Sequence, residues 1–255
     1  MFKDFFPLRV IFEPAETFGR ISAGKTGWGW PLGLYALSIA CSAFMLSVLP
    51  PQFIADSFEG AALPQGRGFW FYLAVAMPGG LVFSLFTCAL LSVFTLFLRA
   101  GRLSLRLPLA ALGLGAFGLL AAAMRASASL RPAGIAAALA ASAFAFLAAR
   151  RKKERFAAML KAILALSVIS VAAELAGGAA ALAGSVETYT ASSYLFSLFM
   201  LVWLAKAGAA VYDTAKPRAA GAAVLAILGS TAFLFLLLNL RLLPQEIFSV
   251  LLLVS

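Results

Sequence analysis

Glu174 is an acidic residue inside an apolar segment, and this position requires a chemical explanation. It lies in LSVISVAAELAGGAAALAG, deep inside a long apolar segment, whereas the other nine acidic residues lie in polar segments or at the ends of apolar ones. An ionised carboxylate inside a membrane is costly unless it is paired, hydrated or protonated. Glu174 therefore predicts a polar site between helices.

Lys206 is the basic residue that a helical hairpin would bring nearest to Glu174. Counted from the turn near Thr188, Glu174 lies 14 residues away and Lys206 lies 18 residues away. This difference corresponds to about 6 Å along the helices, which a lysine stem can span. We predict an ion pair that fixes two antiparallel helices and favour this over a coupled switch. The alternative is a protonated Glu174, with Lys206 reaching the membrane surface.

Most enzymatic mechanisms are disfavoured by the residues that this sequence lacks. It contains no histidine, so histidine-based triads, histidine-ligated metals and histidine proton relays are excluded. The glycines of AALGLGAFGLL lack the lysine of a phosphate-binding loop, and we predict that they pack helices closely. We expect no catalytic residue, no cofactor, no metal and no nucleic-acid partner.

The composition indicates a protein whose solvent is lipid. Hydrophobic residues make up 63% of the 255 residues and charged residues 12%, and the mean hydropathy is +0.99. Apolar runs of at least ~18 residues are long enough to cross a membrane, and only helices satisfy the backbone there. We predict an all-α bundle with seven spans: Pro31–Leu49, Phe69–Leu98, Leu107–Ala123, Pro132–Ala149, Leu160–Ala183, Ser192–Tyr212 and Ala219–Leu240.

The basic residues predict the orientation of these spans. Four precede the first span, three follow the second, six follow the fourth and three follow the sixth, so 16 of the 20 fall on one side. Basic loops stay on the cytoplasmic side, which predicts a cytoplasmic N-terminus, and we expect a prokaryotic cytoplasmic membrane. The hairpin 107–149 is short and rich in Ala and Gly, and removing it would leave a five-span core with the same orientation.

Two terminal segments differ from the spans. Residues 1–30 predict a cytoplasmic, interfacial amphipathic segment before the transmembrane domain 31–255, with a short helix that begins near Pro14. Trp28 and Trp30 are typical of the aromatic belt at a membrane surface. The last segment, QEIFSVLLLVS, is too short to cross a membrane alone, and we predict that it lies on the outer surface.

Glycine and proline mark two further places inside the spans. Pro78, Gly79 and Gly80 interrupt the second span, and Gly177 and Gly178 follow Glu174 in the fifth. Such positions either form hinges with free carbonyls or allow close contact between helices, and we favour close contact. A face of small residues serves either packing within one chain or a homo-oligomer.

The run RRKKERF is the strongest surface feature of the sequence. Basic residues beside a membrane set the topology and attract anionic headgroups, which we expect as lipid partners. A docking site for an acidic cytoplasmic protein is the alternative role. The basic patch consists of Arg150, Arg151, Lys152, Lys153 and Arg155.

Residues 14–21 follow the pattern P-x-x-T-F-x-x-I, and a tryptophan and a proline stand at positions 30 and 31, at the start of the first span. This order of features resembles the Yip1 family of polytopic membrane proteins, whose members carry such a cytoplasmic segment and then a tryptophan and a proline before the first span. The segment 202–228 is similar to the family's penultimate span, short basic turn and small-residue start of the last span. The hairpin 107–149 exceeds the family's usual five spans. The matching residues here are Pro14, Thr17, Phe18, Ile21, Trp30 and Pro31.

This resemblance implies a non-enzymatic protein. Eukaryotic relatives engage small GTPases and help to organise transport vesicles, while prokaryotic relatives mostly lack an assigned activity, and no family catalytic residue exists to carry over. We therefore expect a membrane scaffold that interacts with lipids or a protein partner. The alternative is a small transporter, channel or permease subunit with a polar site near Glu174.

Overall fold

The computed structural model describes residues 6–49 and 67–254, and these residues form helices and turns but no strand. The predicted all-α class is confirmed. The first five residues of the predicted interfacial segment lie outside the described part of the chain. The elements are α1 (Phe6–Phe12), α2 (Pro14–Ser22), α3 (Gly29–Val48), α5 (Phe69–Arg99), α6 (Leu103–Ala126), η1 (Ala128–Leu130), α7 (Arg131–Arg151), α8 (Lys153–Leu182), α9 (Val186–Tyr212), α10 (Lys216–Asn239) and α11 (Gln245–Val254).

Seven of these helices are long and apolar enough to cross a membrane, and each corresponds to one predicted span. The chain is an integral membrane protein with a polytopic helical bundle. Several helices are longer than the apolar runs that revealed them. For example, α9 begins at Val186 because the Ser185 side chain caps it, accepting a hydrogen bond of 3.2 Å from the amide of Thr188.

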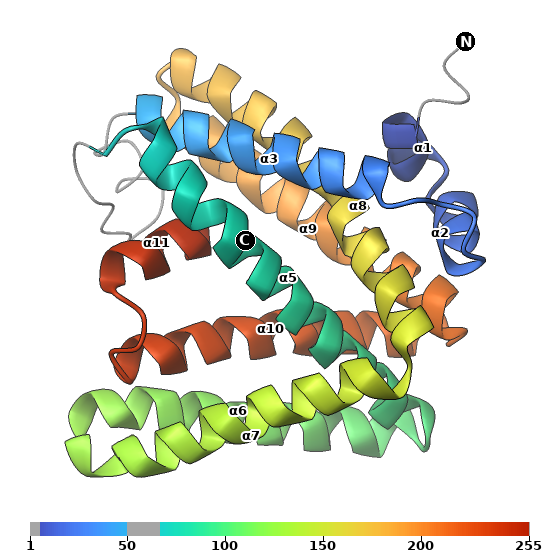
Figure 1. Cartoon of the computed structure of the whole chain (residues 1–255), viewed down its shortest axis with the longest axis vertical. Coiled ribbons are helices and arrows are strands. Elements are labelled where there is room, and N and C mark those ends of the chain that lie inside the picture. The colour runs from blue at the N-terminus through green and yellow to red at the C-terminus, as the bar shows by residue number, and fades with distance from the viewer. Residues whose placement is uncertain (1–5, 50–66, 255) are drawn as a thin grey trace.

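The seven long helices alternate in direction (Figure 1). The turns α5–α6, α7–α8 and α9–α10 lie at the same end of the bundle as α1 and α2, on the right of the view. The turns α6–α7, α8–α9 and α10–α11 lie at the other end. We call the end with α1 and α2 the basic end, because its turns carry most of the basic residues. We call the other end of the bundle the opposite end.

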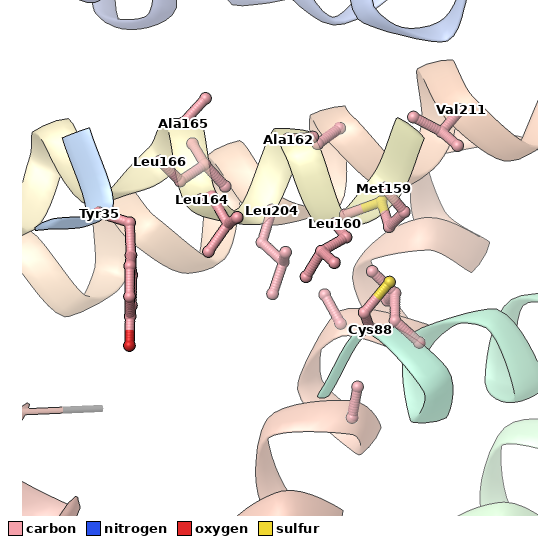
Figure 2. Packing of buried hydrophobic residues seen from close by; sticks show 14 of the residues in the cluster. Tyr35, Cys88, Met159, Leu160, Ala162, Leu164, Ala165, Leu166, Leu204 and Val211 are labelled. Carbon is pink, nitrogen blue, oxygen red and sulfur yellow. The ribbon is translucent and has the colours of Figure 1, made fainter. Parts of the chain in front are cut away.

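The core is centred on α8, which contacts α3, α9 and α5, while α10 contacts α5 and α9. Alanine and leucine make up most of the buried face of α8, because small side chains let the helices approach and larger ones fill the space that remains. Figure 2 shows this packing from close by. Buried residues from several helices meet there: Met159, Leu160, Ala162, Leu164, Ala165 and Leu166 of α8, Leu204 and Val211 of α9, Cys88 of α5 and Tyr35 of α3.

The helices α6 and α7 form the predicted extra hairpin, which lies along one side of the bundle (Figure 1). It is attached mainly through α10, where the Asn239 amide donates a hydrogen bond of 2.7 Å to the carbonyl of Ala121. The predicted close packing of its glycines is wrong. A Cβ at Gly113, Gly115 or Gly118 would have nothing within 4 Å, because these glycines face away from the other helices.

The N-terminal helices pack on the bundle. α2 begins at Pro14 as predicted, and Phe18 and Ile21 are fully buried on the side that contacts α8 and α9. The indole N–H of Trp203 in α9 donates a hydrogen bond of 3.0 Å to the carbonyl of Val10 in α1. We call α1, α2 and the loop 23–28 the N-terminal platform, and it is a structural part of the basic end.

The last helix, α11, turns back toward the middle of the bundle (Figure 1). It contacts α5 and α10, with Val250 fully buried and the Phe235 and Phe248 rings 4.9 Å apart. The prediction that this segment only covers the outer surface is therefore wrong. Its apolar face has partners inside the bundle, and ten residues reach about 15 Å, roughly half of the hydrocarbon thickness.

Candidate functional site

Glu174 is bound to α3 and not to Lys206. The Ser42 hydroxyl donates a hydrogen bond of 2.5 Å to Oε1 of Glu174. Ser42 itself is buried, so this bond satisfies two polar groups between apolar helices. The polar site predicted around Glu174 therefore exists as a contact between α3 and α8.

The predicted ion pair between Glu174 and Lys206 is wrong. Lys206 lies over the Trp203 ring, with Nζ 3.9 Å from the ring centroid, and neither charged group has an ion-pair partner within the described residues. Residues three apart share one helix face, and this face of α9 is directed toward α1 through the bond of Trp203 to Val10. Positions counted along the sequence give the depth of a residue in the membrane but not the rotation of its helix about the helix axis.

Gly177 and Gly178 lie one turn beyond Glu174 and are in close contact with two neighbouring helices. A Cβ on Gly177 would lie 3.0 Å from the Tyr189 ring of α9, and one on Gly178 would lie 3.0 Å from Cε of Met45 in α3. The predicted role of these glycines in close helix contact is confirmed. The small residues let α8 approach two helices beside its carboxylate.

The segment Pro78–Gly80 is also a packing junction. α5 continues through Pro78, which has no N–H to donate to the carbonyl four residues earlier. The Tyr35 hydroxyl of α3 donates a hydrogen bond of 2.5 Å to the carbonyl of Met77 and would lie 2.9 Å from a Cβ on Gly80. Leu251 of α11 fills the space at Gly79. Two helices, α3 and α11, therefore contact α5 at glycines that have no side chain to keep them away.

The basic run forms a sharp corner between two spans and not a loop. α7 ends at Arg151, α8 begins at Lys153, and only Lys152 between them is not helical. Residues 150–153 are exposed and Arg155 is partly buried. The guanidinium of Arg150 lies 5.5 Å from the Phe146 ring centroid. We call Arg150, Arg151, Lys152, Lys153 and Arg155 the basic corner.

Basic residues in the neighbouring turns have different surroundings. Arg218 donates hydrogen bonds of 2.9 and 3.2 Å to the carbonyls of Arg99 and Gly101, and Arg106 donates one of 2.5 Å to the carbonyl of Phe97. These side chains are used to satisfy helix ends. In the basic corner, Arg151, Lys152 and Lys153 have no side-chain partner among the described residues, so their charge is directed outward.

Sequence reasoning missed the hydroxyl groups that join the helices. Besides Ser42, the hydroxyls of Thr87 and Ser230 are 2.8 Å apart between α5 and α10, and Ser92 and Tyr212 form a hydrogen bond between α5 and α9. A signal was present, because hydroxyl residues recur at helical spacing on these apolar spans. In a membrane such groups must find partners in other helices or in their own backbone.

The described residues contain no group of three or more His, Cys, Asp or Glu side chains that could hold a metal ion. No family model matches the chain, and no curated protein or solved structure matches it.

Proposed function

We propose that this protein is a non-enzymatic membrane scaffold whose basic end binds anionic lipids and an acidic protein partner. One observation carries this proposal: Arg151, Lys152 and Lys153 of the basic corner are three consecutive exposed cations without side-chain partners in the described chain, whereas Arg106 and Arg218 of the adjacent turns satisfy helix ends. Each basic residue near an anionic membrane surface contributes about 1 kcal/mol of attraction.

The rigidity of the basic corner supports a binding role as well as a topological one. Topology needs only basic residues near the end of a span, and a flexible loop supplies them. Here two helices fix the backbone on both sides of Lys152, so the side chains of the basic corner start from fixed backbone positions. A fixed backbone loses less conformational entropy when a ligand binds. This arrangement supports selective contact with headgroups or with an acidic segment of a partner.

We also propose membership of the Yip1 family, with a cytoplasmic N-terminus in a prokaryotic cytoplasmic membrane and the option of a homo-oligomer. Most residues of the resembling motif have a structural role that supports this. Pro14 occupies the first turn of α2, Phe18 and Ile21 are buried, and the Thr17 hydroxyl donates a hydrogen bond of 3.1 Å to the carbonyl of Arg9. Trp30 stacks on Phe6 with centroids 6.3 Å apart. The motif therefore builds the N-terminal platform.

The test uses the protein in vesicles of phosphatidylcholine that contain a minority of fluorescent phosphatidylglycerol. Energy transfer from the protein tryptophans reports enrichment of the anionic lipid. We expect enrichment around the unaltered protein, and we expect the double variant Arg151→Gln/Lys152→Gln to reduce it. The matched control, Arg125→Gln/Arg131→Gln, removes two exposed charges at the opposite end and is expected to have a smaller effect. Equal enrichment in a neutral-lipid analogue would contradict the proposal.

A transporter, channel or permease subunit is the second candidate, and the hydrogen bond between Ser42 and Glu174 inside the spans favours it. The close contacts at Gly177 and Gly178 favour a structural role for the same carboxyl group. The variant Glu174→Gln separates the two roles. A coupled transporter would lose solute flux in vesicles while remaining folded, whereas a scaffold would keep its lipid enrichment and lose only some stability.

A further inference from the structure

The N-terminal platform and the start of α3 line a half-open pocket of about 230 Å³ at the basic end of the bundle. Its walls combine basic, hydroxyl and aromatic side chains from α1, α2, the loop 23–28 and the start of α3. The residues that matter for its chemistry are Phe6, Arg9, Arg20, Lys25, Thr26 and Trp30. We propose that this pocket is a binding site for a phosphate-bearing anion, which deepens the proposed function and rests on it.

The charge of the pocket selects an anion. Arg9 already forms ion pairs with Glu13 and Glu16, so its charge is largely compensated. Arg20 and Lys25 are exposed, and within residues 6–49 and 67–254 neither side chain has an ion pair or hydrogen bond. The three cations Arg9, Arg20 and Lys25 outnumber the two carboxylates of Glu13 and Glu16, which leaves this region with one net positive charge. Arginine and lysine together are common ligands of phosphate groups.

The loop 23–28, which lines part of the pocket, is held in place by α8. Lys161 of α8 donates a hydrogen bond of 2.8 Å to the carbonyl of Thr26, and its Nζ lies 5.0 Å from the Trp28 ring centroid. The amides of Thr26 and Gly27 donate to no backbone carbonyl among the described residues. These two amides are therefore available to donate hydrogen bonds to a bound anion. The carbonyl of Thr26, which would repel an anion, is bound to Lys161.

The size and position of the pocket restrict the ligand further. A volume of about 230 Å³ holds several waters at roughly 30 Å³ each, but it lies below the range of about 300–1,000 Å³ for drug-sized ligands. A phosphate or a phosphoglycerol group fits this volume better than a nucleotide. Phe6 and Trp30 form an apolar wall, and Trp30 lies in the first turn of α3. Because α3 is long and apolar enough to cross a membrane, a lipid packed against the start of this helix would bring its headgroup phosphate to the pocket.

The experiment compares two phosphate sources in the full-length protein. Native mass spectrometry measures retained phosphatidylglycerol after purification from mixed lipids, and calorimetry with sodium phosphate in neutral detergent measures the free anion. We expect Arg20→Gln/Lys25→Gln to weaken binding about tenfold or more, because two charge-assisted contacts are lost. Lipid retention without phosphate binding identifies a membrane lipid as the source. Phosphate binding that the variant abolishes identifies the free anion.

Two further variants make the test specific for the pocket. Arg102→Gln/Lys216→Gln removes two exposed charges at the same end, outside both the pocket and the basic corner, and should leave binding within about twofold. Gly27→Leu keeps the charge but places a side chain in open space at the pocket wall, and it should weaken binding.

Three results would contradict the proposed anion site. They are no binding of either probe, equal losses of binding in the pocket variant and the charge control, or full binding in Arg20→Gln/Lys25→Gln. The failure of the proposed function is a different result. It fails if vesicles show no enrichment of phosphatidylglycerol around the unaltered protein. Enrichment of phosphatidylglycerol can persist and depend on the basic corner while the pocket variants bind the probes as well as their control does. That result would contradict only the anion site in the pocket and not the proposed function.

Discussion

The helices α8 and α6 are almost equally apolar, yet only α8 is part of the core. The mean hydropathy of their most apolar windows is 2.2 and 2.0, but 44% of the α8 window is buried and only 11% of the α6 window. Lipid tails are as apolar as leucine, so hydrophobicity does not draw a helix from lipid into a protein core. Shape and hydrogen bonds decide the position of each helix.

The glycines of the two helices show what shape contributes. Gly177 and Gly178 of α8 are in close contact with other helices, whereas Gly113, Gly115 and Gly118 of α6 have open space where a Cβ would stand. The same residue type therefore has two roles in one chain. In the core it permits close approach, and in the hairpin it leaves a smooth surface directed away from the protein.

The largest difference in stability between the core and the hairpin is expected for the truncation of a leucine. Leu166 of α8 is 1% exposed, and Leu166→Ala should lower the free energy of unfolding by about 2 kcal/mol, because a cavity replaces packed atoms. Leu112 of α6 is 72% exposed, and Leu112→Ala should change it little. Unfolding in a denaturing detergent, followed by circular dichroism, measures both variants. Similar losses in the two would break the distinction between core and hairpin.

Adding volume at a glycine tests the same distinction in the other direction. Gly80→Leu would force a side chain against Tyr35 and Ile39, and overpacking of this kind costs about 1–3 kcal/mol. Gly115→Leu enters open space and should be neutral in a monomer. Thermal denaturation in detergent compares them. If Gly115→Leu were as destabilising as Gly80→Leu, the hairpin glycines would be buried in a contact between chains.

The polar contact of α8 gives a smaller effect. Ser42→Ala removes the donor to Glu174 and should cost about 1 kcal/mol, the net value of a typical hydrogen bond. Ser47→Ala on the same helix removes only a local bond of 2.7 Å to the carbonyl of Phe44 and should cost less. The unfolding assay described above resolves this difference. A neutral Ser42→Ala would show that water replaces the hydroxyl and that the site is hydrated.

The smallest effect is expected where the core meets the N-terminal platform. Trp203→Phe keeps most of the ring but loses the hydrogen bond to Val10, so α1 should exchange its amide hydrogens faster while the global stability changes by no more than about 1 kcal/mol. Trp70→Phe, at a highly exposed ring, is the control. Unchanged exchange in α1 would mean that Phe18 and Ile21 alone hold the platform.

The sequence predicted the helices well because membrane spans are constrained by length and apolarity, and the start of α2 was predicted by Pro14. It could not predict which way a helix turns about its axis, since most of its residues are equally apolar. This is why Lys206 was paired with the wrong group and Ser42 was missed. The N-terminal pocket was missed for a related reason: it needs the loop 23–28 to be held by Lys161, a residue distant in the sequence.

The contact between α11 and α5 has a consequence for biosynthesis. Gly79 and Leu251 are 172 positions apart, so at about 5–20 residues per second the ribosome completes α11 roughly 10–30 s after the second span. During that interval Tyr35, which is made earlier, can already pack at Gly80, but Leu251 does not yet exist to fill Gly79. The segment of α5 around Gly79 and Gly80 is thus covered in two stages, and Gly79 stays open until most of the chain has been made.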